Sequence, residues 1–134
     1  MSSENVGVVQ GFIEASGRGD LDALMAALDP TVEWTPVESD PDFAVHRGHD
    51  DVRGWLVEWA EALPDMRWEA ERILDAGGEV VVALVRAVGR GAVSGLDVET
   101  RAYGTVFTIR SGKIVRIEEY ADRKQALGAV GLRE

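Results

Sequence analysis

The chain has 134 residues, with 14 Lys and Arg against 24 Asp and Glu, which gives a formal net charge of −10. A chain of this length buries roughly 65–70% of the surface of its unfolded form, enough for one core and one pocket. The acidic excess disfavours nucleic acid and anionic membrane surfaces, because both bind proteins through Lys and Arg. We therefore expect a single domain over residues 1–134 with neither partner.

The first part of the chain carries two helical patterns and a short strand. Apolar residues recur at helical spacing over residues 4–17, and Gly-Arg-Gly ends that pattern. Asp20 can cap a second helix over residues 21–28, which Pro30 must stop. Residues 31–34, Thr-Val-Glu-Trp, then predict a strand.

The third helical pattern is the clearest in the chain. It follows a proline-containing loop over residues 36–48, begins at His49 or Asp50 and ends before Pro64. We expect its Trp55 and Trp59 to face inward together, because they lie one helical turn apart on the same apolar stripe. Core packing is the simpler interpretation of this pair, and the wall of a ligand pocket is the functional one.

After Pro64 the apolar period becomes two, which predicts strands over residues 66–74, 79–88, 97–110 and 113–121. Asp122 can then cap a short final helix. Helices followed by strands indicate an α+β fold with an antiparallel sheet.

One strand suggests how the chain assembles. Residues 80–88 are apolar at both parities, so we expect this strand to be covered on both faces. Few helices remain to supply the second cover. The sequence therefore predicts a homodimer joined through the outer face of the sheet.

Three short segments carry a family resemblance: Val45-His46-Arg47-Gly48; Gly89-Arg90-Gly91 with Ser94-Gly95; and Ser111-Gly112-Lys113-Ile114 through Tyr120-Ala121-Asp122. With the order of elements, they resemble the SnoaL-like branch of the nuclear transport factor 2-like superfamily, which is ketosteroid isomerase-like, over nearly the whole chain. The resemblance implies a cone-shaped, curved antiparallel sheet packed with N-terminal helices around a pocket for a small, largely apolar molecule. The superfamily includes steroid isomerases, polyketide cyclases, epoxide hydrolases, dehydratases and pure binding proteins.

The catalytic residues of these relatives are only partly matched. Steroid isomerases keep a catalytic Asp just after the first strand, where this sequence has Trp34, so that chemistry loses its base. The epoxide hydrolases carry a carboxylate on the last strand immediately before a Tyr, and Glu119 stands there before Tyr120. They also use an Arg and an Asp two residues apart, whereas Arg86 has no acid two residues later.

The strand pattern singles out Glu119 without the family. It shares one strand face with apolar neighbours, namely Val115, Ile117 and Ala121. Burial on that face would raise the pKa of the Glu119 carboxyl and make it a general acid or base near neutral pH. The alternatives are a Glu neutralised by an Arg, or a solvated Glu at the strand end.

Three further residues are catalytic candidates. Arg86 interrupts an apolar strand face, so it would pair with Glu119 or a ligand oxygen, or form an ion pair at a subunit interface. Tyr103 could donate its hydroxyl to a carbonyl or an enolate, or form a structural hydrogen bond. His46 could shuttle protons at the pocket mouth. His46 and His49, with Asp50 and Asp51, superficially suggest metal ligands, but their spacing precedes the helix and no third or fourth ligand is local, so we expect no metal and no cofactor.

Together these patterns predict one of two functions. The first is a cofactor-independent isomerase, cyclase, dehydratase or hydrolase acting on a small hydrophobic carbonyl or polyketide-like compound. The second is a non-catalytic binding or regulatory dimer. In either, we expect four aromatic residues to line the pocket: Trp34, Trp55, Trp59 and Phe107. With no Cys, and no apolar segment near the ~20 residues that span a bilayer, we expect a cytoplasmic protein.

Overall fold

The computed structural model describes residues 2–37, 44–62, 67–90 and 97–132, and it confirms the α+β fold. The helices of these residues are α1 (Ser2–Arg18), α2 (Leu21–Ala27), α3 (Gly48–Ala62) and α4 (Arg123–Ala129). The strands are β1 (Leu28–Thr35), β2 (His46–Arg47), β3 (Arg67–Asp75), β4 (Val80–Arg90), β5 (Asp97–Arg110) and β6 (Lys113–Tyr120).

Two of the helices begin where the sequence predicts, each at an Asp side chain that caps its first turn. The Asp20 carboxylate accepts a hydrogen bond from the backbone N–H of Ala23 at 3.1 Å, at the start of α2. The Asp122 carboxylate accepts one from the N–H of Lys124 at 2.8 Å, at the start of α4. Each carboxylate satisfies an N–H group that has no partner inside its helix.

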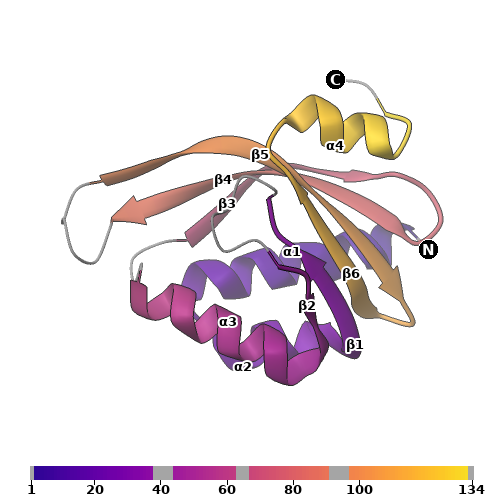
Figure 1. The fold of residues 1–134 in the computed structure, drawn as a ribbon. Helices are drawn as coiled ribbons and strands as arrows, with labels where there is room; N and C mark the ends of the chain where they lie inside the picture. The colour runs from indigo at the N-terminus through magenta and orange to yellow at the C-terminus, as the bar shows by residue number, and fades with distance from the viewer. Residues whose placement is uncertain (1, 38–43, 63–66, 91–96, 133–134) are drawn as a thin grey trace.

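The strands form one sheet in the order β2-β1-β6-β5-β4-β3. Neighbouring strands are antiparallel except β1 and β6, which are parallel. The twisted sheet curves over α1, α2 and α3, whereas α4 lies on its other side (Figure 1). We call the face toward α1 the inner face and the face toward α4 the outer face.

The main core lies between the inner face and the first three helices. It contains Val9 and Phe12 of α1, Met25 of α2 and Val52 of α3, packed with strand residues that include Trp34, Val81, Ala83, Val85, Phe107 and Ile117. A smaller cluster lies under α4 and contains Val82, Leu84, Val106, Ala126 and Leu127. Residues 81–85 of β4 are therefore buried on both faces, as the sequence predicts, whereas Arg86 is exposed.

Over Val82 and Leu84, the second cover of β4 comes from the chain itself. The chain's own α4 packs on the outer face, so closely that a Cβ added to Gly104 would lie 2.3 Å from the Cβ of Ala126. The inference that another subunit supplies this cover was therefore wrong for Val82 and Leu84, because the short helix α4 supplies enough apolar surface. A homodimer through the outer face stays a prediction, and the burial of β4 no longer argues for it.

A bulge in β6 decides which of its side chains face inward. The pairing with β5 shifts from Thr108 opposite Arg116 to Ile109 opposite Ile114, which leaves Val115 as an extra residue. Ile114 therefore joins the inner core in place of Val115, contrary to the simple alternation. Beyond the bulge the alternation holds, so Ile117 and Glu119 share the inner face.

Candidate functional site

Glu119 on β6 binds the end of β1 and the segment that follows it. The indole Nε1 of Trp34 donates a hydrogen bond to Glu119 Oε2 at 3.0 Å, and the backbone N–H of Val37 donates to Oε1 at 3.2 Å. The carboxyl is half-buried, on the inner face as its strand parity predicts. Both of its oxygens thus accept hydrogen bonds from the protein itself.

Trp34 is the centre of an aromatic cluster on this face. Its side chain is 3% exposed, and its ring centroid lies 5.1 Å from that of Trp55 and 5.9 Å from that of Trp68. Phe12 lies 5.8 Å from Trp34 and also 5.8 Å from Phe107. These tilted and edge-to-face contacts are favourable geometries for aromatic rings, and they bring three of the four predicted pocket residues into one cluster.

His46 lies beside this cluster because β2 pairs with β1. Its backbone is directly opposite Trp34, and its ring stacks on Trp55 with centroids 4.4 Å apart and planes at 16°. Its Nδ1 lies 3.0 Å from Oδ1 of Asp51, in the first turn of α3. The tight passage from β2 into α3 places Asp51 there, through Gly48 at φ +83°.

The Asp51 carboxylate determines which ring nitrogen of His46 carries the hydrogen. Hydrogen bonds from His46, and then from the backbone N–H of Arg47 at 2.9 Å, lower the pKa of Asp51 below its usual value. An ionised carboxylate has no hydrogen to give, so His46 donates through Nδ1. When the ring is neutral, Nε2 therefore carries the lone pair. Nε2 is buried, and it has no hydrogen-bond partner in the described part of the chain.

A buried hydroxyl lies opposite Glu119 on the neighbouring strand. Thr105 of β5 is paired in register with Glu119 of β6 and is 0% exposed. Its Oγ1 also lacks a hydrogen-bond partner among the described residues. The inner face thus carries a carboxylate, an imidazole and a hydroxyl around the aromatic cluster.

Arg86 does not join this group. It lies at the outer-face parity of β4, with its side chain 56% exposed and its guanidinium 3.4 Å from the carboxylate of Glu71. Arg123 of α4 binds the same carboxylate at 2.7 Å. Of the alternatives for Arg86, pairing with Glu119 is therefore wrong, because the two side chains lie on opposite faces. The ion pair that Arg86 forms with Glu71 is within the chain.

Trp59 also lies elsewhere than predicted. It is 40% exposed, whereas Trp55, one turn earlier, is packed against Trp34 and His46. The C-terminal end of α3 extends away from β1 and β2 (Figure 1). The apolar stripe of α3 therefore extends beyond the part of the helix that β1 and β2 cover. Tyr103 pairs with Val85 through its backbone, but its side chain lies outside the described residues and its role stays a prediction.

The sequence reasoning missed three residues of the site. Trp68 lies near the start of a predicted strand, and only its aromatic side chain on that strand could have indicated that it belongs to the cluster. Asp51 resembles an ordinary acidic residue in the first turn of a helix. Thr105 has the strand propensity of its Val neighbours, so nothing local distinguishes its hydroxyl.

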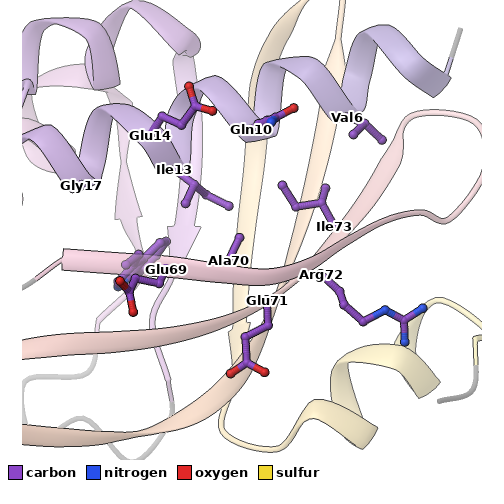
Figure 2. Close-up of a pocket in the computed structure, with 11 residues that line it drawn as sticks. Val6, Gln10, Ile13, Glu14, Gly17, Glu69, Ala70, Glu71, Arg72 and Ile73 are labelled. Carbon is purple, nitrogen blue, oxygen red and sulfur yellow. The ribbon is translucent and has the colours of Figure 1, made fainter.

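A groove of about 650 Å³ lies between α1 and β3. Figure 2 shows Ile13, Ala70 and Ile73 between the helix and the strand, whereas Glu71 points away from α1. Trp68 lines the groove and also contacts Trp34. The aromatic cluster therefore extends to the wall of a surface groove that the sequence did not reveal.

The remaining histidine has a structural contact. His49 Nε2 lies 2.8 Å from the backbone oxygen of Leu28, which ties α3 to β1. Within the described ranges, no three His, Cys, Asp or Glu residues are grouped so that they could hold a metal ion. In the same ranges, none of the helices has both the length and the apolar character that crossing a membrane requires.

The sequence and the fold both have known relatives. The family model of the SnoaL-like domain matches residues 9–117. The chain belongs to the SnoaL-like family. No curated protein matches the sequence. Solved structures also match this chain over most of its length.

Three of these solved structures illustrate which proteins the chain is similar to. A nuclear transport factor 2-like protein of unknown function from Burkholderia pseudomallei is 25% identical, with a TM-score of 0.76 over 95% of this chain and 97% of that one. A ketosteroid isomerase-like protein from Catenulispora acidiphila, in complex with trimethylamine, is 14% identical, with a TM-score of 0.74 over 94% and 93%. TerC, co-crystallised with polyporic acid, is 19% identical, with a TM-score of 0.75 over 87% and 89%. The expected nuclear transport factor 2-like fold is confirmed.

Proposed function

We propose that this SnoaL-like chain binds a small, largely apolar molecule at the aromatic cluster and transfers a proton to and from it without a cofactor. The observation that carries the proposal is the buried, unpartnered Nε2 of His46. Buried polar atoms are nearly always hydrogen-bonded, so an exception calls for an explanation, of which a catalytic role is one. Solved relatives in complex with trimethylamine and with polyporic acid support a small-molecule ligand.

His46 and Asp51 would act together in the proton transfer. The lone pair of His46 Nε2 takes a proton from a carbon atom next to a ligand carbonyl, and the ring becomes an imidazolium. The ionised Asp51 stabilises this cation through Nδ1 and holds the ring in place. Return of the proton to another ligand atom completes an isomerisation, and the same step can begin a cyclisation or a dehydration.

Glu119 has a different part in this proposal from the proton carrier that the sequence suggests. Its two oxygens are engaged by Trp34 and by the backbone of Val37, so the carboxylate anchors the segment after β1 to β6. From that position it would orient polar groups of the ligand. Trp55 and Phe107 would enclose the apolar part and exclude water.

A non-catalytic binding module is the second candidate. The contacts of Glu119 favour it, because a carboxylate already engaged through both oxygens has a sufficient structural reason to exist. In this reading the ligand stabilises the fold and no proton moves. The two candidates differ in whether bound ligand exchanges hydrogen with solvent.

The test uses a panel of apolar ketones and lactones with hydrogens next to the carbonyl. Binding is screened by thermal shift, and exchange of those hydrogens in deuterated water is followed by proton NMR. His46→Gln should slow exchange by about 10²–10⁴-fold and leave the dissociation constant within a few-fold. His49→Gln replaces the chain's other histidine with the same residue and should leave exchange unchanged.

The outcomes separate the two candidates. Exchange at the wild-type rate in His46→Gln would refute the role of His46. Ligands that bind the wild-type protein without exchanging would identify a binding module. Asp51→Asn should slow exchange less than His46→Gln, because it removes the charge that stabilises the imidazolium and leaves the base itself.

A further inference from the structure

The buried hydroxyl of Thr105 is a second unpartnered polar group that proton transfer by His46 does not use. Thr105 is fully buried, and it is the polar residue within the described core of the sheet. Its Oγ1 has no hydrogen-bond partner among the described residues. Leaving a buried hydroxyl without a partner destabilises a fold, so this group calls for a partner from outside the chain.

Two observations place this hydroxyl on the inner face. A Cβ on the preceding residue, Gly104, would collide with Ala126 of α4, so position 104 faces outward. Successive residues of a strand alternate, so Thr105 faces inward. Phe107, two residues further on, belongs to the inner core and agrees with this direction.

The neighbours of Thr105 define what its partner must be. On β4 it is paired with Ala83, which offers only a methyl group, and on β6 with Glu119. Side chains paired across two strands have Cβ atoms about 4.5–5.5 Å apart, so one ligand atom can reach both. An ionised carboxylate only accepts hydrogen bonds, whereas a hydroxyl both donates and accepts.

A threonine is also not needed here for packing. Valine has the same shape and a similar strand propensity, and it occupies positions 81, 82 and 85 of the paired strand β4 and the next position, 106, of β5. Valine at position 105 would fill the same space without burying a hydroxyl. The hydroxyl therefore costs stability, which indicates a role in binding.

We infer that Thr105 and Glu119 together recognise a hydroxyl group of the ligand. The ligand hydroxyl donates its hydrogen to the Glu119 carboxylate and accepts one from Thr105 Oγ1. A bare carbonyl suits this pair less well, because its oxygen would face the carboxylate oxygens. The ligand is accordingly an apolar molecule that carries a phenolic or alcoholic hydroxyl. This inference rests on the proposed binding of a small apolar ligand, but not on proton transfer.

The test compares 2-naphthol with naphthalene, which has the same ring system without the hydroxyl. Dissociation constants are measured by equilibrium dialysis on the full chain. The wild-type protein should bind 2-naphthol about tenfold more tightly than naphthalene. Thr105→Val should weaken 2-naphthol binding by about 3- to 10-fold and leave naphthalene binding unchanged.

Two control variants exclude a merely structural effect. Thr105→Ser keeps the hydroxyl and should keep the preference for 2-naphthol. Thr108→Val makes the same change on the same strand at an outward-facing position and should alter neither constant. Thr105→Val should also raise the melting temperature of the free protein, because it removes a buried hydroxyl that has no partner.

Every result bears on the inference. Equal affinity of the wild-type protein for the two probes, absence of binding to both, or an unchanged preference in Thr105→Val would overturn it. His46→Gln should retain the preference for 2-naphthol. A preference for 2-naphthol without hydrogen exchange on the ketone panel would therefore refute proton transfer and leave this inference standing, whereas exchange without the preference would do the reverse.

Discussion

The hydrogen bond between Trp34 and Glu119 holds β1 and β6 together at the site, and its energy can be measured. The indole N–H donates to a half-buried carboxylate at 3.0 Å, which is a good geometry for a charge-assisted bond. Hydrogen bonds to charged groups contribute about 1.5–3 kcal/mol. We take about 2 kcal/mol as the expected coupling energy, because the carboxylate is not fully buried.

A double-mutant cycle isolates this energy from the other effects of each substitution. Trp34→Phe removes the indole N–H together with part of the contacts to Trp55 and Trp68. Glu119→Ala also removes the hydrogen bond from Val37. These additional losses cancel when the double variant is compared with the two single variants. Urea unfolding at neutral pH supplies the four free energies of unfolding.

The control cycle combines Phe12→Leu with Glu119→Ala. Phe12 contacts Trp34 but has no polar atom for the carboxylate, so its coupling with Glu119 should stay below about 0.5 kcal/mol. If the measured coupling energy between Trp34 and Glu119 were as small as that of this control cycle, the view that their hydrogen bond fixes the site would be refuted. Glu119 would then be available for the proton-carrier role that the sequence suggests.

Three further predictions concern α4, Asp51 and Arg86. Gly104→Ala should destabilise the protein by about 1–3 kcal/mol in urea unfolding, because the added methyl group would displace α4. The control is Gly128→Ala, whose methyl group would have no atom within 4 Å, and it should be neutral or stabilising. Equal effects of the two substitutions would contradict the close packing of α4. The pKa of Asp51 is lowered in the folded state, so the contribution of this carboxylate to stability is present above the ordinary pKa of 3.8 and is lost as the pH falls through the lowered folded value. The stability advantage of the wild-type protein over Asp51→Asn, measured as urea midpoints, should therefore shrink as the pH drops below 3.8. An advantage that grew on acidification would contradict the hydrogen bond to His46. Arg86→Ala should change 2-naphthol binding less than twofold and cost at most about 1 kcal/mol, because its ion pair is exposed on the outer face; a large loss of binding would return it to the site.

The elements of this fold could be read from the sequence because local interactions determine them. The carboxylates of Asp20 and Asp122 cap helices within three residues along the chain, and apolar periods distinguish helices from strands. The inward face of Glu119 followed from the same period. The exception is β2, a strand of two residues that has no pattern of its own and exists because β1 lies beside it.

The composition of the site could be predicted only in part. Trp34, Trp55 and Phe107 were recognised because large apolar residues at regular spacing are generally buried. His46 was identified as a proton carrier, but its partner Asp51 was not, because that contact depends on the turn between β2 and α3. Thr105 was missed, since a hydroxyl becomes significant only when the surrounding structure leaves it without a partner.

The sequence by itself determined the α+β class, the order of the helices and strands and the SnoaL-like family, because each depends on residues that are close along the chain. The tertiary structure alone decided that α4 covers the outer face, that Arg86 pairs with Glu71, and that Trp59 is exposed while Trp68 joins the cluster. The physical reason is that a period of two shows only that side chains alternate. Which face becomes the inside depends on the packing of segments distant along the chain, and a single bulge such as that at Val115 reverses the alternation.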